Sequence, residues 1–79
     1  MIKRELKAVM ARFGDRQEDL AAYLHVTRGT LSSKINGNTA FTQPEIEKIA
    51  LRYELTAEDI QRIFFASTVK ENLTAENFT

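Results

Sequence analysis

Signals that start and stop helices recur along this chain at intervals too short for any long helix. Gly14 and the Asn-Gly-Asn turn at residues 36–38 are typical helix ends. Thr27 is a typical N-cap, and Thr42 with Glu45 forms a capping box around a first-turn proline. The segments between these signals allow only about three helical turns each. The chain is therefore restricted to several short helices that must pack against one another.

Apolar residues between these signals repeat at helical intervals, and no segment shows the alternation of a strand. A second capping box is expected at residues 15–18, with the Asp15 side chain accepting a hydrogen bond from the Glu18 amide. Phe64 is expected in the core, and the two tyrosines in the core or at its rim. The pattern predicts helices over residues 2–13, 16–24, 28–36, 43–53 and 56–66, which makes an all-α fold.

The composition disfavours several classes of protein. There is no run of about 18 apolar residues, so we expect no membrane span. The first five residues are not followed by the apolar stretch of a secretion signal, and the absence of cysteine fits a reducing cytoplasm. With a single histidine and no glycine-rich loop, we expect no enzyme, no metal, no cofactor and no small-molecule substrate.

The charges cancel over the whole chain but are unevenly distributed. Residues 1–40 hold seven basic and four acidic residues, and residues 41–79 hold four and seven. No acidic residue occurs between Asp19 and Glu45, a stretch rich in serine, threonine and asparagine. Such a surface tolerates a polyanion, although the two cations in this stretch are also compatible with an ordinary solvated face.

The predicted helix over residues 28–36 is built from residues that a helix used only for packing would avoid. Gly29, Ser32 and Ser33 all lower helix stability, with glycine costing about 1 kcal/mol relative to alanine. Small side chains allow a helix to approach a large surface closely, and hydroxyl groups can bond to phosphates or base edges. Arg28 stands at the N-terminal end, where a DNA-reading helix enters the major groove.

Residues 17–37, which read QEDLAAYLHVTRGTLSSKING, resemble the helix-turn-helix of phage repressors and Cro proteins. The shared features are the opening Gln, the Leu-Ala pair, the Leu-x-Val-Thr turn, the aliphatic residue in the second helix and the closing Asn-Gly. The resemblance extends over about residues 4–65, through residues 41–50 and the Ile-Phe-Phe at 63–65. It implies a five-helix bundle of the phage-repressor-like helix-turn-helix type as a DNA-binding domain over residues 1–66. A polar tail over residues 67–79 would then serve dimerisation or be partly ordered.

The resemblance also implies a role for individual positions. The base-reading positions are Arg28, Gly29, Ser32 and Ser33. The positions that meet the DNA backbone are Gln17, Thr27, Thr30, Lys34, Asn36, Asn38 and Thr42. The alternatives are a phosphate contact or solvated charge for Arg28, tolerated surface for the two serines and plain surface for Lys34. His25 stands where the family usually has glycine in a left-handed conformation, so we expect a slightly reshaped turn.

The function that the resemblance implies is sequence-specific binding of double-stranded DNA by a transcriptional regulator. We expect a small phage or prophage repressor that acts as a homodimer on an inverted repeat, in the cytoplasm or nucleoid of a bacterial host. Phe65 and Phe78 are candidates for the dimer interface, because exposed phenylalanines often mark contact surfaces. The alternative is a protein-interaction module, such as an antirepressor or an antitoxin-like partner, that binds a regulatory protein through its acidic second half.

Overall fold

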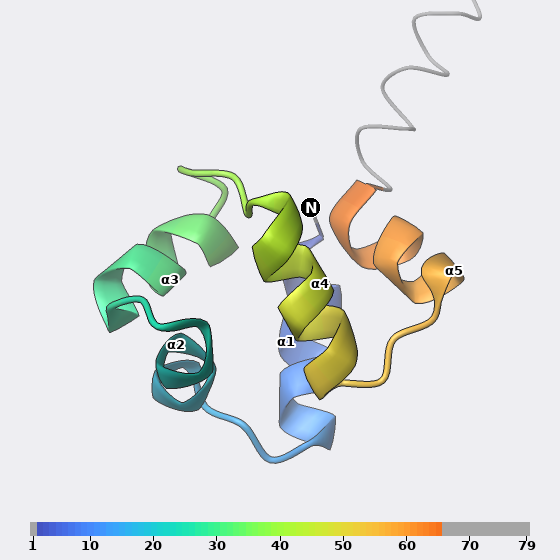
Figure 1. The fold of residues 1–79 in the computed structure, drawn as a ribbon, viewed down its shortest axis with the longest axis horizontal. Coiled ribbons are helices and arrows are strands. Elements are labelled where there is room, and N and C mark those ends of the chain that lie inside the picture. Colours follow the sequence, from blue (N-terminus) through green and yellow to red (C-terminus); the bar gives the residue numbers. More distant parts are fainter. Residues whose placement is uncertain (1, 66–79) are drawn as a thin grey trace, which may run out of the picture.

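The computed structural model describes residues 2–65, and this part of the chain is entirely helical (Figure 1). The elements are α1 (Lys3–Arg12), α2 (Gln17–Leu24), α3 (Arg28–Ile35), α4 (Gln43–Arg52), α5 (Ala57–Ile60) and a π-helical turn, η1 (Gln61–Phe65). The predicted all-α fold with five helices is confirmed, and the first four helices begin and end within one residue of the prediction. None of the described helices has the length and apolar character needed to span a bilayer.

The end of the fold differs from the single α-helix predicted up to residue 66. α5 has only four residues, and η1 continues it as a wider turn. The adjacent side chains of Ile63 and Phe64 are both buried there, whereas Phe65 is exposed. The Ile2 N–H donates to the Ile63 carbonyl at 2.7 Å, so η1 is tied to the residue that precedes α1.

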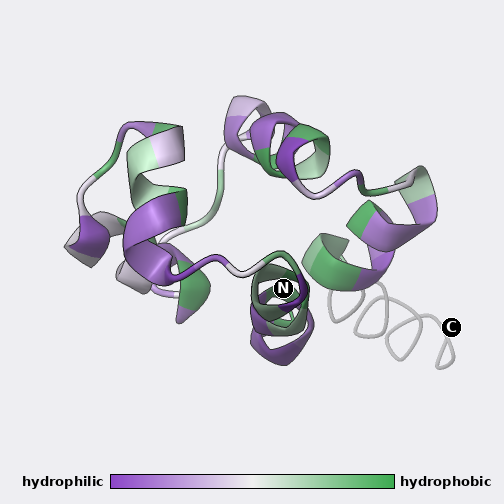
Figure 2. Cartoon of the chain, turned by 90° about the horizontal axis from the view of Figure 1, so that it is seen from below, coloured by the Kyte–Doolittle hydropathy of each residue, from purple (hydrophilic) through white to green (hydrophobic). Residues whose placement is uncertain are grey.

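The core is built from apolar side chains of α1 to α4 and η1, and no charged or polar residue among residues 2–65 is buried. Figure 2 shows hydrophobic and hydrophilic residues alternating along the helices, as expected for helices that bury one face. Phe64 lies in the core as predicted, Tyr53 is buried and Tyr23 is half-buried. The most deeply buried side chains are Leu6, Leu20, Leu31, Ile35, Ile49 and Ile63.

α2 and α3 form one end of the molecule, with α1 and α4 in the middle and α5 at the other end (Figure 1). α3 is held by only two buried side chains, Leu31 and Ile35, which are 0% and 1% exposed. Of its other residues, Arg28, Gly29 and Thr30 are exposed, whereas Ser32, Ser33 and Lys34 are half-buried.

Asp15 does not cap α2, so that prediction is wrong. The N-cap is Arg16, and its N–H donates to Asp19 Oδ2 at 2.8 Å. Asp15 instead accepts two hydrogen bonds from Arg52, at 2.6 Å from Nε and 2.9 Å from Nη2, and one from the Tyr53 hydroxyl at 2.7 Å. Arg52 and Tyr53 together offer Asp15 three donors, two of them on a charged guanidinium, whereas an N-cap position would offer a single amide.

This carboxylate joins three parts of the fold. It ties the turn between α1 and α2 to the C-terminal end of α4, and the Arg52 guanidinium also lies 4.7 Å from the centre of the Tyr23 ring in α2. The hydrogen bonds from Arg52 lower the pKa of Asp15 below the usual aspartate range, although its burial acts in the opposite direction. The carboxylate in turn raises the pKa of Arg52, and burial with the bond to Asp15 raises that of Tyr53.

We expect Asp15→Asn to lower the free energy of unfolding at pH 7 by about 2 kcal/mol, because Arg52 and Tyr53 lose a charged acceptor. The folded-state pKa of Asp15 is depressed, so its contribution is present above the unfolded pKa and is lost as pH falls through the folded pKa. The difference between the native chain and the variant should therefore shrink between about pH 5 and pH 2. Urea unfolding followed by circular dichroism across this range measures it, and a difference that does not change with pH would contradict the assignment.

Candidate nucleic-acid interface

A three-residue turn, residues 25–27, connects α2 to α3. His25 is left-handed, with φ 62° and ψ 39°, which is the conformation expected of the glycine that is usual at this position. Its N–H donates to the Ala22 carbonyl at 3.2 Å, and the Val26 N–H donates to the Ala21 carbonyl at 3.0 Å. These two bonds are the usual closure of a helix with a left-handed residue after its last turn. The turn is therefore formed in the ordinary way without glycine, and the expected reshaping is not seen.

Thr27 begins α3, as predicted. Its Oγ1 accepts from the Thr30 N–H at 3.1 Å, and its hydroxyl donates to the Thr30 Oγ1 at 2.9 Å. Both threonines are exposed, and α3 has no acidic residue in its first turn. Since free N–H groups and the helix dipole give this end a partial positive charge, the start of α3 favours an anion.

The predicted base-reading residues lie on uncovered parts of α3. Arg28 and Gly29 are exposed, and Ser32 and Ser33 are half-buried. Ser32 and Ser33 lie three and four positions after Gly29, which places both beside Gly29 on the helix surface. Asn36 continues this surface, since its Nδ2 donates to the Ser32 Oγ at 3.4 Å.

Neither Arg28 nor Gly29 has a structural role that the contacts within residues 2–65 reveal. Within residues 2–65 the Arg28 guanidinium takes part in no ion pair. No atom lies within 4 Å of the position that a Cβ on Gly29 would occupy, so packing within the chain does not require glycine there. A glycine that costs helix stability without an internal reason indicates a close external contact.

The loop between α3 and α4 carries the other predicted backbone contacts. Asn36 and Asn38 are exposed, and Gly37 between them is left-handed with φ 87°. Thr42 is the N-cap of α4, since its Oγ1 accepts from the Glu45 N–H at 3.3 Å and its own N–H donates to Glu45 Oε1 at 2.8 Å. The predicted capping box is confirmed.

Gln17 is the first residue of α2 and is half-buried.

Lys34, which was predicted to meet the DNA backbone, is a half-buried residue of α3. Its side chain is only 10% exposed, and Nζ lies 3.0 Å from Glu45 Oε1. The same ammonium donates to the Ala40 carbonyl at 3.1 Å. Sequence reasoning assigned Glu45 to the capping box alone, because that local pattern gives no sign of a second partner. Lys34 is therefore paired within the chain and is not carried forward as a phosphate contact.

The electrostatic environment of Glu45 is shaped by these partners. Burial favours its neutral form, but the Thr42 amide and the Lys34 ammonium outweigh that effect and hold the pKa of Glu45 below its usual range. The Glu45 carboxylate is therefore ionised near neutral pH.

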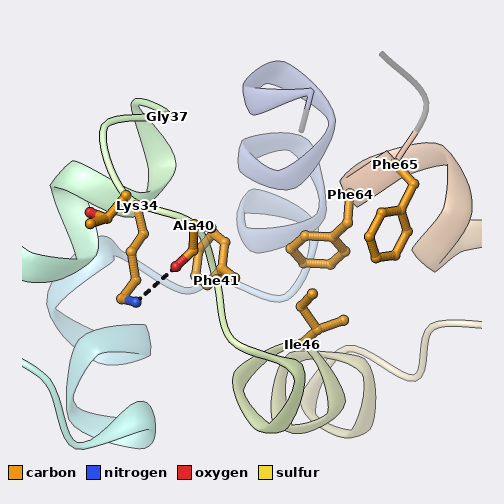
Figure 3. Close-up of a pocket in the computed structure, with 8 residues that line it drawn as sticks. Lys34, Gly37, Ala40, Phe41, Ile46, Phe64 and Phe65 are labelled. Carbon is orange, nitrogen blue, oxygen red and sulfur yellow. Dashed lines mark hydrogen bonds between the residues drawn. The ribbon is translucent and has the colours of Figure 1, made fainter. Parts of the chain in front are cut away.

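A hollow of about 320 Å³ lies between the α3–α4 loop and η1 (Figure 3). Its apolar walls are Phe41, Ile46, Phe64 and Phe65, and the rings of Phe41 and Phe64 meet edge to face with centroids 5.6 Å apart. Phe65, a predicted dimer residue, is 37% exposed at its edge. The other predicted dimer residue, Phe78, lies outside the described residues.

The groups gathered around α3 are suited to binding nucleic acid. They are hydroxyls, side-chain amides and one guanidinium, which bond to phosphate oxygens and base edges. Among residues 2–65, no three histidine, aspartate or glutamate side chains are grouped so as to hold a metal ion.

Comparison with known proteins agrees with this geometry. A family model described as helix-turn-helix matches residues 6–60, from α1 to the end of α5. Neither a curated protein nor a solved structure matches the chain.

We expect His25→Gly to raise the free energy of unfolding by about 0.5 to 1 kcal/mol. The left-handed conformation costs a residue with a Cβ about 1 to 2 kcal/mol, and the greater backbone entropy of unfolded glycine offsets part of the gain. His25→Ala is the control, because alanine keeps the Cβ and should give no increase. Denaturant midpoints measure both variants, and equal stability of the two would show that the turn is not strained.

Proposed function

Because this chain belongs to the helix-turn-helix family of the Cro and C1 type, we propose that it is a repressor that reads a specific operator in double-stranded DNA. The family is one of DNA-binding transcription regulators. We further propose that the protein is a phage or prophage regulator without enzymatic activity, that it acts in the cytoplasm or nucleoid of a bacterial host, and that its DNA-binding domain spans residues 1–66. The single observation that carries the proposal is the surface of α3, where an arginine without an ion-pair partner among residues 2–65 stands beside the small residues Gly29, Ser32 and Ser33.

In this proposal α3 lies in the major groove. Arg28 bonds to a guanine through two parallel hydrogen bonds, the commonest specific contact between arginine and DNA. Gly29 allows the helix backbone to approach the base edges, and the hydroxyls of Ser32 and Ser33 bond to bases directly or through water. Since three of these four residues are short, sequence-dependent DNA shape contributes to the specificity.

Neutral hydrogen-bonding groups around α3 hold the DNA backbone. The N-terminal ends of α2, α3 and α4 each place free N–H groups at the surface, where phosphates bind readily. The acid-free stretch between Asp19 and Glu45 covers α3 and both of its connections, so phosphates meet little repulsion from that segment. The residues assigned to this role are Gln17, Thr27, Thr30, Asn36, Asn38 and Thr42.

Two copies acting together supply enough contacts for specific recognition. One module reads only a few base pairs, and a two-fold pair reads an inverted repeat with half-sites about 34 to 36 Å apart. The exposed Phe65 supports a contact between copies. We assign the tail over residues 67–79, with Phe78, to the same contact.

Selection of bound duplexes from a random pool, together with the mass of the protein in solution, tests this function. We expect a palindromic consensus and twice the mass of one chain. Equal affinity for the selected and random duplexes would contradict specific recognition. A protein complex formed through residues 54–79 with no DNA shift at low salt would favour the interaction-module alternative.

We expect Arg28→Ala to weaken binding to the selected duplex by roughly 1 to 3 kcal/mol and to relax the preference at one base position. The loss follows from removing the two hydrogen bonds to one guanine. Arg12→Ala removes an exposed arginine at the C-terminal end of α1 and serves as the charge-matched control. Titration against the consensus and its single-base variants measures the effect, and a uniform loss across all sequences would make Arg28 a phosphate contact.

We expect Gly29→Ala to separate folding from binding. An added methyl group meets no atom of the chain, so the free energy of unfolding should stay the same or rise by up to about 1 kcal/mol. The same methyl group should lower operator affinity at least about tenfold, because it holds the helix away from the base edges. Unchanged affinity in a stable variant would place Gly29 outside the interface.

A further inference from the structure

The paired cation of α3 connects this helix to the start of α4. Lys34 lies near the C-terminal end of α3, and Glu45 lies in the first turn of α4. Their side chains are 10% and 16% exposed, so water and salt screen the 3.0 Å contact less than they screen a surface ion pair. The loop over residues 36–42 runs between these two attachment points.

The same two side chains also bind the loop itself. Lys34 Nζ donates to the Ala40 carbonyl at 3.1 Å, which Figure 3 shows beside Phe41. The Glu45 carboxylate accepts from the Thr42 N–H at 2.8 Å. The pair therefore fixes the second half of the loop through two separate main-chain hydrogen bonds.

Further contacts make the loop continuous with the core. The Asn38 N–H donates to the Ser33 carbonyl at 2.9 Å, which closes the end of α3. The Lys34 ammonium lies 5.9 Å from the centre of the Phe41 ring, and this ring packs edge to face on the buried Phe64. All of these contacts are made together in the observed conformation of the loop, and Lys34 or Glu45 takes part in three of them.

We propose that Lys34 and Glu45 are positioning residues for DNA binding. Their ion pair holds the 36–42 loop where Asn36, Asn38 and Thr42 meet the DNA backbone, and neither charged group itself contacts DNA. This proposal rests on the DNA-binding function proposed above.

For the loss of the Glu45 charge, this proposal predicts the opposite change in DNA affinity from the one that charge alone predicts. If only charge mattered, removing the Glu45 carboxylate beside a polyanion would strengthen DNA binding. If the carboxylate holds the loop, its removal weakens binding, although the protein becomes more positive. A lysine that contacts phosphate would also behave differently. Its loss makes the negative slope of log affinity against log salt about 0.9 less steep.

The test compares Glu45→Gln, Lys34→Met and the double variant with Glu47→Gln on the selected duplex. Glutamine keeps an oxygen that accepts from the Thr42 N–H, so the cap of α4 is preserved while the charge is lost. Glu47 is an exposed acid on the same helix and is the matched control for charge alone. We expect each variant of the pair to lose roughly five- to tenfold in affinity, and the double variant to lose no more than either single one. Glu47→Gln should bind as tightly as the native chain or more tightly.

Two results would overturn the proposal. One is tighter binding by Glu45→Gln, as expected from charge alone, and the other is a salt slope reduced by about one in Lys34→Met. Amide hydrogen exchange of residues 37–41 gives a readout without DNA. Exchange should be faster in both variants of the pair and unchanged in Glu47→Gln, and unchanged exchange in all variants would also overturn the proposal. If the native chain selects no duplex at all, the proposed function fails, whereas the exchange experiment still tests the positioning of the loop.

Discussion

The Asp15 carboxylate is the group on which the mutual placement of the first four helices most depends. The core among the described residues is wholly apolar, and apolar burial is not directional. Asp15 adds direction, because its bonds to Arg52 and Tyr53 are satisfied in only one arrangement of the α1–α2 turn against α4. With α2 held against α4 through Tyr23 and Arg52, the turn at His25 and the cap at Thr27 determine where α3 points.

Local signals made most of this fold predictable. The helix bounds, the cap at Thr27 and the left-handed turn at His25 depend on neighbours within five residues, which periodicity and cap patterns report directly. The predictions for Asp15 and Lys34 missed their partners for the opposite reason. The charge of each residue also fits a local pattern, an N-cap for Asp15 and a surface cation for Lys34. The true partners, Arg52 and Glu45, lie further along the sequence, so only the packed helices reveal the pairing. The π-helical turn was missed because its sequence also fits an ordinary helix.

The residue types of the candidate interface could be predicted from the sequence, but which of these residues also bond within the chain could not. The sequence marks residues 28–38 as unusually small and polar, and the structure divides them by whether their side chains bond within the chain. Within residues 2–65, Arg28 forms no ion pair and nothing in the packing requires Gly29, whereas Thr27 caps α3 and Lys34 links it to α4. If the proposed function holds, substitutions of the first kind should affect recognition with little effect on folding, and those of the second kind should affect both.

The hydrogen bond between Ile2 and Ile63 brings the two limits of the described chain together. It joins the residue that precedes α1 to the turn that follows α5. A local opening at either place therefore loosens the other, so the beginning and the end of the described fold form one cooperative unit.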